Sequence, residues 1–271
     1  YPFFSPDGLH WTPGPDVRVH FLPQNEFQQI LLDPLERDPA RKFKIYGQLH
    51  GLPSNKPGPA TVRKIIMGYG PDLAHLALSP DNPILDTNEG LEQEQHFASV
   101  FPYRGYYVML YNYNRYADYY GQGVWGKFVG DIRLAVSRDG EHFRRVNAHQ
   151  PLVRRGKRGE WDSGFVFVAN AVDFENQVYV YYTGAGEIWS SWPAKNRTVD
   201  DGKRSLSGFS YPAQMGLAVL RSDGFTHLRA SDEYGPGVMT TIPIQVVNPG
   251  RVRLLVNVAE GMAYRNWVEV E

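Results

Sequence analysis

A seven-residue turn motif recurs along the chain and constrains its fold more than any other feature. It reads Ser-x-Asp-Gly-x-His-aromatic in Ser5–Trp11 and returns in Ser137–Phe143, in shorter form in Ser222–Leu228, and as a degenerate copy in Gly70–Leu76. An aspartate followed by glycine favours a tight turn, because the carboxylate can close an Asx turn and glycine tolerates positive φ. The first three aspartates in chain order lie about 65 residues apart. Such a spacing indicates a structural repeat.

The segments between these turns have the composition of β-strands. Tyr106–Tyr111, Val178–Tyr182 and Val252–Val258 are rich in β-branched and aromatic residues. No segment has a convincing helical period, so the chain is predicted to be all-β. A repeat of about 65 residues that holds several strands is typical of a β-propeller with large four-stranded blades.

The repeat length also predicts the domain organisation. Residues 1–271 hold about four blades of a single propeller domain, and the sequence begins and ends in mid-blade. Either the two half-blades close a four-bladed ring, or an N-terminal blade is missing from this sequence. Trp267–Glu271 reads as mid-strand, which predicts trimming at the C-terminus as well.

Composition excludes several classes of function. The net charge is −1 and no block of like charges occurs, so we expect neither a nucleic-acid partner nor a membrane. The absence of cysteine rules out thiol nucleophiles and cysteine metal sites. The eight histidines lack ligand spacing, and those of the turn motif are expected to be structural. No cofactor is therefore predicted, although a structural Ca²⁺ stays open.

The chain resembles the five-bladed β-propeller glycoside hydrolases, the superfamily of families 43 and 32 that includes β-fructosidases, arabinanases and xylosidases. The turn motif carries this resemblance, together with Gly159–Gly164, Tyr179–Gly184 and Met215–Phe225. The resemblance implies five blades, a carbohydrate substrate and hydrolysis of a glycosidic bond, which slightly favours a secreted or periplasmic location. The chain departs from it in lacking the Trp-x-Asn-Asp-Pro and Glu-Cys-Pro motifs of the fructosidases.

Three acidic residues are the candidate catalytic groups. Asp33, Glu94 and Asp162 each flank a strand-like run, and residues that open a blade are expected to surround one channel mouth. Glycoside hydrolysis needs one protonated and one ionised carboxyl group. We expect Glu94 to be the acid, with Glu92 raising its pKa or taking its place and His96 as its hydrogen-bond partner. If an N-terminal blade is missing, the resemblance gives Asp33 the second-blade role and Glu94 the third-blade role, and the first-blade aspartate lies outside this sequence or is replaced by Asp162.

Each of these residues also has a structural interpretation. Asp33 precedes a proline and could open a turn. Asp162 could cap the entry to a strand. Glu92 and Glu94 could be solvated loop residues.

Aromatic side chains are the candidate sugar-binding groups, because sugars stack their apolar faces on aromatic rings. Tyr113 and Trp125 lie in one aromatic stretch, Trp161 precedes Asp162, and Trp189 lies in an insertion. Packing between blades is the alternative for the first stretch, and a mobile surface loop or an interface for the insertion.

Two other functions stay open. One is a propeller that binds a glycan or a partner domain without catalysis. The other is a glycoside phosphorylase, which would need a cationic cluster, with Arg63, Arg104 and Arg115 as its candidates. No oligomeric state is predicted.

Overall fold

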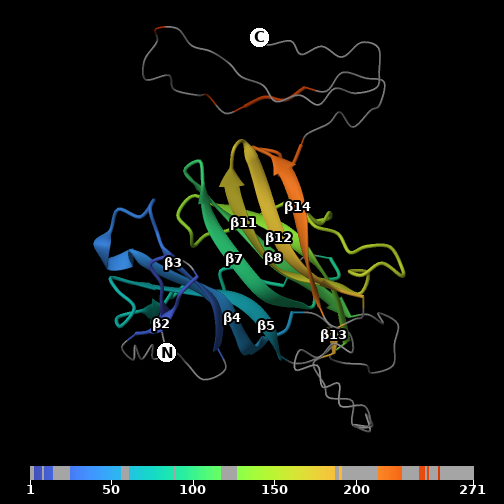
Figure 1. Cartoon of the computed structure of the whole chain (residues 1–271), viewed down its shortest axis with the longest axis horizontal. Helices are drawn as coiled ribbons and strands as arrows, with labels where there is room; N and C mark the ends of the chain where they lie inside the picture. Colours follow the sequence, from blue (N-terminus) through green and yellow to red (C-terminus); the bar gives the residue numbers. More distant parts are fainter. Residues whose placement is uncertain are drawn as a thin grey trace. The chain divides into compact units, whose positions relative to one another are not determined.

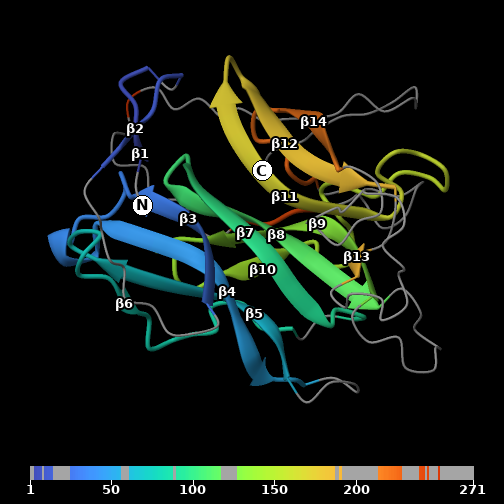
Figure 2. The ribbon, with the colours of Figure 1, turned by 60° about the horizontal axis from the view of Figure 1, so that its bottom comes forward.

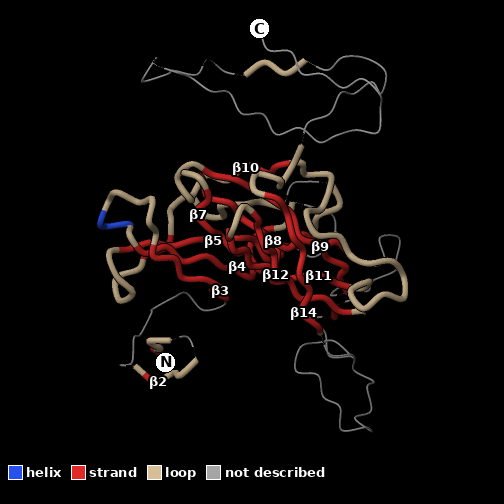
Figure 3. Tube along the Cα trace, turned by 45° about the horizontal axis from the view of Figure 1, so that its top comes forward, coloured by secondary structure: helices blue, strands red, loops and turns tan. Residues whose placement is uncertain are grey.

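The structure is a computed structural model that describes residues 3–7, 9–14, 25–55, 61–87, 90–116, 127–186, 189–190, 213–227, 238–241, 243 and 250. Contacts divide the chain into two units, Tyr1–His227 and Leu228–Glu271, and all described strands belong to the first. The strands expected between residues 242 and 258 lie almost entirely outside the described residues. The described part is almost purely β, and its helical element is one short 3₁₀ turn, η1 (Pro39–Arg41) (Figure 3). No described helix has the length and apolar character needed to cross a membrane.

The strands form a two-stranded, a four-stranded and an eight-stranded sheet, and we divide the last two sheets into three blades that follow one another along the chain (Figures 1 and 2). Blade I contains β3 (Asn25–Leu32), β4 (Phe43–Pro53), β5 (Thr61–Gly70) and β6 (Ala77–Leu78). Blade II contains β7 (Glu94–Tyr103), β8 (Tyr106–Tyr116), β9 (Lys127–Ser137) and β10 (Arg144–Val146). Blade III contains β11 (Phe165–Phe174), β12 (Gln177–Ala185) and β14 (Gln214–Arg221). A hairpin of β1 (Phe3–Phe4) and β2 (Thr12–Pro13) precedes them, and β13 (Trp189–Ser190) pairs with β9.

The first strands of the three blades, β3, β7 and β11, are equivalent, and we call them the inner strands. Each loses register with its neighbour near its third residue, at Phe27/Gln29, His96/Ala98 and Phe167/Ala169. A bulge repeated at one place in three successive sheets marks a true structural repeat. The inner strands begin about 70 residues apart. The predicted all-β propeller architecture is thus confirmed, with blades slightly longer than expected.

Two hydrophobic seams hold the blades together, and β8 contributes to both. Met109 and Tyr111 pack with Tyr46 and Met67 of blade I. Val108 and Leu110 point the other way and pack against blade III, where Val180 lies. Because successive side chains of a strand point to opposite faces, one strand of blade II can supply the core of both seams.

The turn motif forms the Asx turns expected from the sequence. Asp7, Asp72 and Asp139 each accept hydrogen bonds from the backbone N–H groups two and three residues later, and each contacts Nδ1 of the following histidine. The structural role predicted for these histidines is therefore confirmed at His10 and His142. The fourth copy differs, because Asp223 has a φ of 59° and bonds to the Tyr103 hydroxyl.

Candidate active site

The inner strands run parallel, so their starting residues gather at one end of the blades, which we call the entry end. Gln29 of β3 bonds through its amide to both the N–H and the carbonyl of Val100 in β7, which places these strands side by side. β11 pairs in parallel with β9, which in turn runs parallel to β7 through β8. Residues that begin β3, β7 and β11 therefore share the entry end, and those that follow these strands lie at the far end.

Glu94 begins β7 at the entry end, and its carboxylate contacts the side chains of Arg63 and His96. Its Oε2 accepts a hydrogen bond from Arg63 Nη1 of β5 at 2.9 Å and lies 2.7 Å from His96 Nε2. The side chain of Glu94 is 8% exposed and that of His96 is 3% exposed. Both bonds fall on Oε2, so among the described residues Oε1 of Glu94 has no hydrogen-bond partner.

These contacts fix the charge of the pair. Burial alone would raise the pKa of Glu94, but the bond with His96 and the charge of Arg63 lower it below its ordinary value. Burial lowers the pKa of His96 despite the nearby carboxylate. Glu94 is therefore ionised, and the neutral His96 ring donates Nε2–H to it. The raised pKa expected for Glu94 is wrong, because Arg63 and His96, not Glu92, are its neighbours.

Glu26 is a second carboxylate at the entry end, and the sequence patterns did not single it out. Its Oε1 lies 2.7 Å from His50 Nε2 of β4, and its side chain is 52% exposed. Arg63 Nε in turn donates to His50 Nε2 at 3.0 Å, and its Nη1 donates to Glu94. Arg63 and His50 thus link an exposed carboxylate of blade I to a buried carboxylate of blade II.

The backbone bulge in β7 supports this arrangement. Phe97, the bulged residue, has a φ of 52°, and its N–H is free of the β-ladder. That N–H donates to Gln48 Oε1, while Gln48 Nε2 donates to Glu26. Bulges re-aim neighbouring side chains and occur often beside active sites. Here the bulge joins Glu26 of one blade to the strand that carries Glu94.

Glu92 lies just before β7 but does not contact Glu94. Its fully buried carboxylate accepts hydrogen bonds from Arg145 Nη2 at 2.7 Å and from Gln95 Nε2 at 3.2 Å. Burial raises the pKa of Glu92 to about 7, against the opposing effect of Arg145. A raised pKa suits an acid, but this carboxyl group is enclosed and cannot reach a ligand in this conformation.

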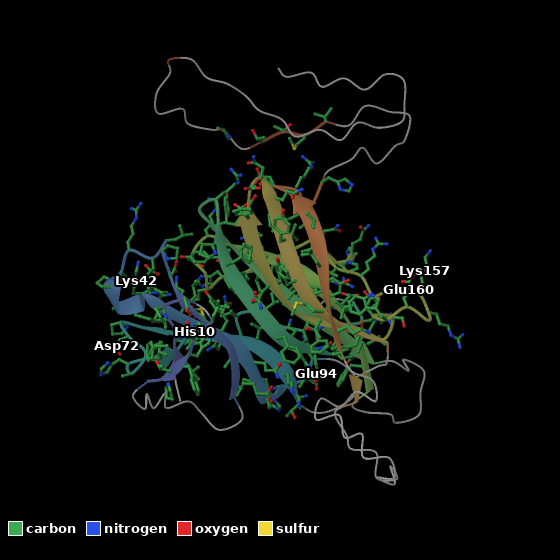
Figure 4. All side chains as sticks on the ribbon, in the orientation of Figure 1. His10, Lys42, Asp72, Glu94, Lys157 and Glu160 are labelled. Carbon is green, nitrogen blue, oxygen red and sulfur yellow. The ribbon has the colours of Figure 1, made fainter. Side chains whose placement is uncertain are left out.

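Asp33 follows β3 and therefore lies at the far end, away from Glu94. Its N–H donates to the carbonyl of Lys42, which Figure 4 shows on the opposite side of the blades from Glu94. Its carboxylate accepts hydrogen bonds from the buried Lys44 at 2.5 Å and from the Tyr107 hydroxyl at 2.6 Å. This corrects the expectation that Asp33, Glu94 and Asp162 surround one mouth.

The far end also carries a cavity of about 460 Å³. Its acidic lining residues are already bonded, since Glu36 pairs with Lys44 and Glu141 pairs with Arg41 and the Ser79 hydroxyl. These contacts explain the carboxylates as parts of a buried ionic network between blades I and II.

Asp162 precedes β11 at the entry end, beside an aromatic pair. It is 7% exposed, and its Oδ2 accepts a hydrogen bond from the Tyr182 hydroxyl at 3.2 Å. Trp161 stacks on Tyr182 with centroids 5.8 Å apart and remains 37% exposed. The exposed part of this indole is an apolar surface on which a ring can stack.

The other predicted aromatic residues have different surroundings. Tyr113 is 6% exposed and packs in the seam between blades I and II with the Arg133 guanidinium over its ring, which agrees with interblade packing. Trp189 pairs with Phe128 through its backbone, and its side chain lies outside the described residues, as does Trp125.

The three arginines considered for a cationic cluster do not all lie at one end, although Arg115 follows Asn114, the residue opposite Glu94. Arg63 binds Glu94 at the entry end, whereas Arg104 follows β7 and pairs with Asp223. In the described part of the chain, no three His, Asp or Glu side chains are arranged to hold a metal ion.

Aligning the repeats on their turn aspartates brings Glu26 forward as an alternative to Asp33 but does not decide between them. Glu94 follows its turn aspartate, Asp72, by 22 residues. After Asp7, Glu26 follows by 19 residues and Asp33 by 26 residues. The connecting segment varies in length, so spacing alone could not choose between the two acids. The strand-like run Ile30–Leu32 precedes Asp33, which is the one clue that Asp33 ends a strand and does not begin one.

Comparisons with known proteins find similar folds among solved structures. No family model matches the sequence, and a search of curated proteins finds no match. A complex of BT0996 with RGII is 14% identical with a TM-score of 0.47, covering 74% of this protein and 47% of the matched one. A structure described as a glycoside hydrolase is 13% identical with a TM-score of 0.47, covering 76% and 48%. The Bombyx mori GH32 β-fructofuranosidase BmSUC1 is 9% identical with a TM-score of 0.42, covering 66% and 31%.

Two of these three matched proteins are named as a glycoside hydrolase or a GH32 enzyme. The chain spans about half the length of the first two matched structures. At such TM-scores the likeness is too distant to assign an activity. The activity therefore has to be inferred from the chain's own residues.

Proposed function

We propose that the chain cleaves glycosidic bonds, with Glu26 and Glu94 as its two catalytic carboxyl groups. The observation that carries the proposal is their pairing at the entry end, from the starts of inner strands in adjacent blades. One is buried and ionised, the other is half exposed, and Arg63 and His50 bridge them. Two carboxyl groups in opposed environments are what glycoside hydrolysis requires.

The environments suggest which residue has which role. Glu94 is ionised, so its outward Oε1 would attack the anomeric carbon or take a proton from an attacking water. Glu26 would donate a proton to the leaving oxygen and, because its side chain is 52% exposed, would take a proton back from water. This exchanges the acid role that the sequence suggested for Glu94, because an ionised carboxylate cannot donate a proton. Trp161 would stack on a sugar ring beside Asp162.

The test uses aryl glycosides of arabinofuranose, fructofuranose, xylose, galactose and fucose with leaving groups of different pKa. Glu94→Gln should lower kcat by about 10³-fold or more for every leaving group, because it removes the base or nucleophile. Glu26→Gln should lower kcat strongly only for poor leaving groups, because good ones depart without a proton.

The matched control is Glu175→Gln, an exposed glutamate in the β11–β12 turn, which should keep full activity. Full turnover in both site variants would contradict the proposal. If no aryl glycoside is turned over, glycan binding measured by calorimetry, and its loss in Trp161→Ala, would favour the non-catalytic propeller.

A further inference from the structure

Two buried amides on β8 have hydrogen-bonding atoms that nothing described so far uses. Asn112 and Asn114 are both 0% exposed. Asn112 Nδ2 donates to the carbonyl of Val166, but among the described residues Asn112 Oδ1 has no hydrogen-bond partner, and neither has Nδ2 or Oδ1 of Asn114. Buried polar groups are almost always hydrogen-bonded, so unpaired ones in a native fold call for an explanation.

The strand register places these amides beside the proposed catalytic residue. Asn114 lies directly opposite Glu94, and Asn112 directly opposite His96. Directly opposed residues share a face of the sheet, with Cβ atoms about 4.5–5.5 Å apart. Glu94 has an oxygen, Oε1, without a described partner, and Asn114 has an unpaired donor, Nδ2.

The next strand leaves room for the amides. Gly130 of β9 lies opposite Asn114. A Cβ added at Gly130 would come within 2.5 Å of Asn114 Oδ1, 2.8 Å of Asn112 Nδ2 and 2.7 Å of Phe165 Cε2. Glycine at this position therefore lets both amides lie under the inner end of blade III, on the face that carries Glu94.

We propose that Asn114 is a positioning residue that holds a water molecule against Oε1 of Glu94. The two groups are neighbours without a direct bond, and a single water between them would satisfy the amide donor and the carboxylate acceptor together. The proposal deepens the proposed function, since a water fixed at the ionised Glu94 is the one that this carboxylate would activate.

The charged and titratable groups around Glu94 are known from every described strand that packs against it. Arg63 comes from β5, His50 from β4, Glu26 from β3 and His96 from β7 itself. The residues beside Glu94 in the row across β8 and β9, Asn114 and Gly130, do not titrate. A change at Asn114 that alters the titration of Glu94 therefore acts through the hydrogen bond and not through a removed charge.

The experiment measures Glu94 directly, so it does not depend on any substrate. The side-chain carboxyl signals of ¹³C-labelled glutamates are followed by NMR across pH, with Glu94→Gln identifying the Glu94 signal. Asn114→Leu, which has a similar shape and no donor, should raise the pKa of Glu94 by about 0.5–1 unit, because ionised Glu94 loses a hydrogen bond. Asn170→Leu, on the exposed part of β11, is the control and should leave it unchanged.

Asn114→Ser shortens the side chain and replaces its amide by a hydroxyl group that is withdrawn from Glu94, and it carries the test if leucine perturbs the fold. If a substrate is turned over, Asn114→Ser should lower kcat about 10-fold without changing KM. The acid limb of the kcat–pH profile should shift together with the Glu94 titration measured by NMR. An unchanged Glu94 titration in both variants would overturn the inference even if both are less stable. Loss of the proposed function would show instead as absent turnover with the NMR shift intact.

Discussion

At the scale of single residues, carboxylates at the two ends of the inner strands have different roles. Asp33 sits among Lys44, Tyr107 and a backbone N–H, and both of its carboxylate oxygens accept hydrogen bonds. Burial alone would raise the pKa of Asp33, but these bonds lower it. Glu94 keeps one oxygen without a described partner. A carboxylate whose bonds are all internal stabilises the fold, whereas one with an open oxygen can act on a ligand.

Asp33→Asn therefore separates stability from activity. Removing one of the two carboxylates that pair with the buried Lys44 leaves only Glu36 to balance its charge, so the free energy of unfolding should fall by about 2 kcal/mol. The kcat of the folded variant should stay at the wild-type value, because Asp33 is at the far end. Adding Lys44→Met should recover part of the lost stability in urea unfolding. A large loss of kcat in a stably folded Asp33→Asn variant would place Asp33 back in the catalytic set.

The buried Glu92 predicts a pH dependence of stability. Its pKa is about 7 in the folded chain against an ordinary value of 4.5, so the folded state binds the proton more tightly between these values. The free energy of unfolding contributed by Glu92 should therefore fall as pH rises from about 4.5 to 7, by up to about 3 kcal/mol. Glu92→Gln removes this contribution. The stability difference, wild type minus variant, should decline across that range in urea titrations, and a constant difference would contradict the assignment.

At the scale of elements, the repeated turns do two jobs, closing a hairpin and docking it on the preceding blade. The turn of blade II is bound by blade I, since Lys44 and Tyr46 donate to the carbonyls of Asp139 and Gly140. The turn of blade III is bound by Tyr103 of blade II. The turn at Asp72 is largely exposed. Related copies of one turn motif thus have different tertiary surroundings.

This difference predicts unequal costs for the same substitution. Asp72→Ala loses only the local Asx bonds and should cost about 1 kcal/mol. Asp139→Ala should cost about 2–3 kcal/mol, because the turn that receives Lys44 and Tyr46 is released as well. Urea midpoints of the two variants give the comparison. Equal midpoints would mean that docking adds nothing to the turn.

The turns were also the part of the fold that the sequence predicted best. An Asx turn is a local structure, so Asp7, Asp72 and Asp139 could be recognised from their neighbours in the chain. The face and end at which an acid lies depend on strand pairing, which is non-local. Glu94 was recognised because it begins its strand, whereas Asp33 was misplaced and Glu26 missed because the start of β3 has no local signal. The contacts of Arg63 and His50 come from strands far away in sequence and could not be inferred.

At the scale of the molecule, the blades of the unit Tyr1–His227 share their cores through one strand. β8 places Met109 in one seam and Val108 in the other, so neither seam can open without exposing apolar surface of β8. The site lies across the same blades, with Glu26 on blade I, Glu94 on blade II and Trp161 beside blade III. Its geometry therefore depends on both seams.

Shared strands predict that this unit unfolds as one cooperative body. Met109→Ala, in the first seam, should cost about 2–4 kcal/mol, and Val180→Ala, in the second, about 1–3 kcal/mol, because each leaves a cavity in a buried core. Hydrogen exchange should become faster in both β4 and β12 in each variant, because the amides of both strands then exchange through global unfolding of the unit. Val180→Ala that accelerates exchange only in β12 would show that the seams open independently. In that case Trp161 could separate from Glu94 while blades I and II stay folded, and sugar stacking would be lost before the Glu26–Glu94 pair.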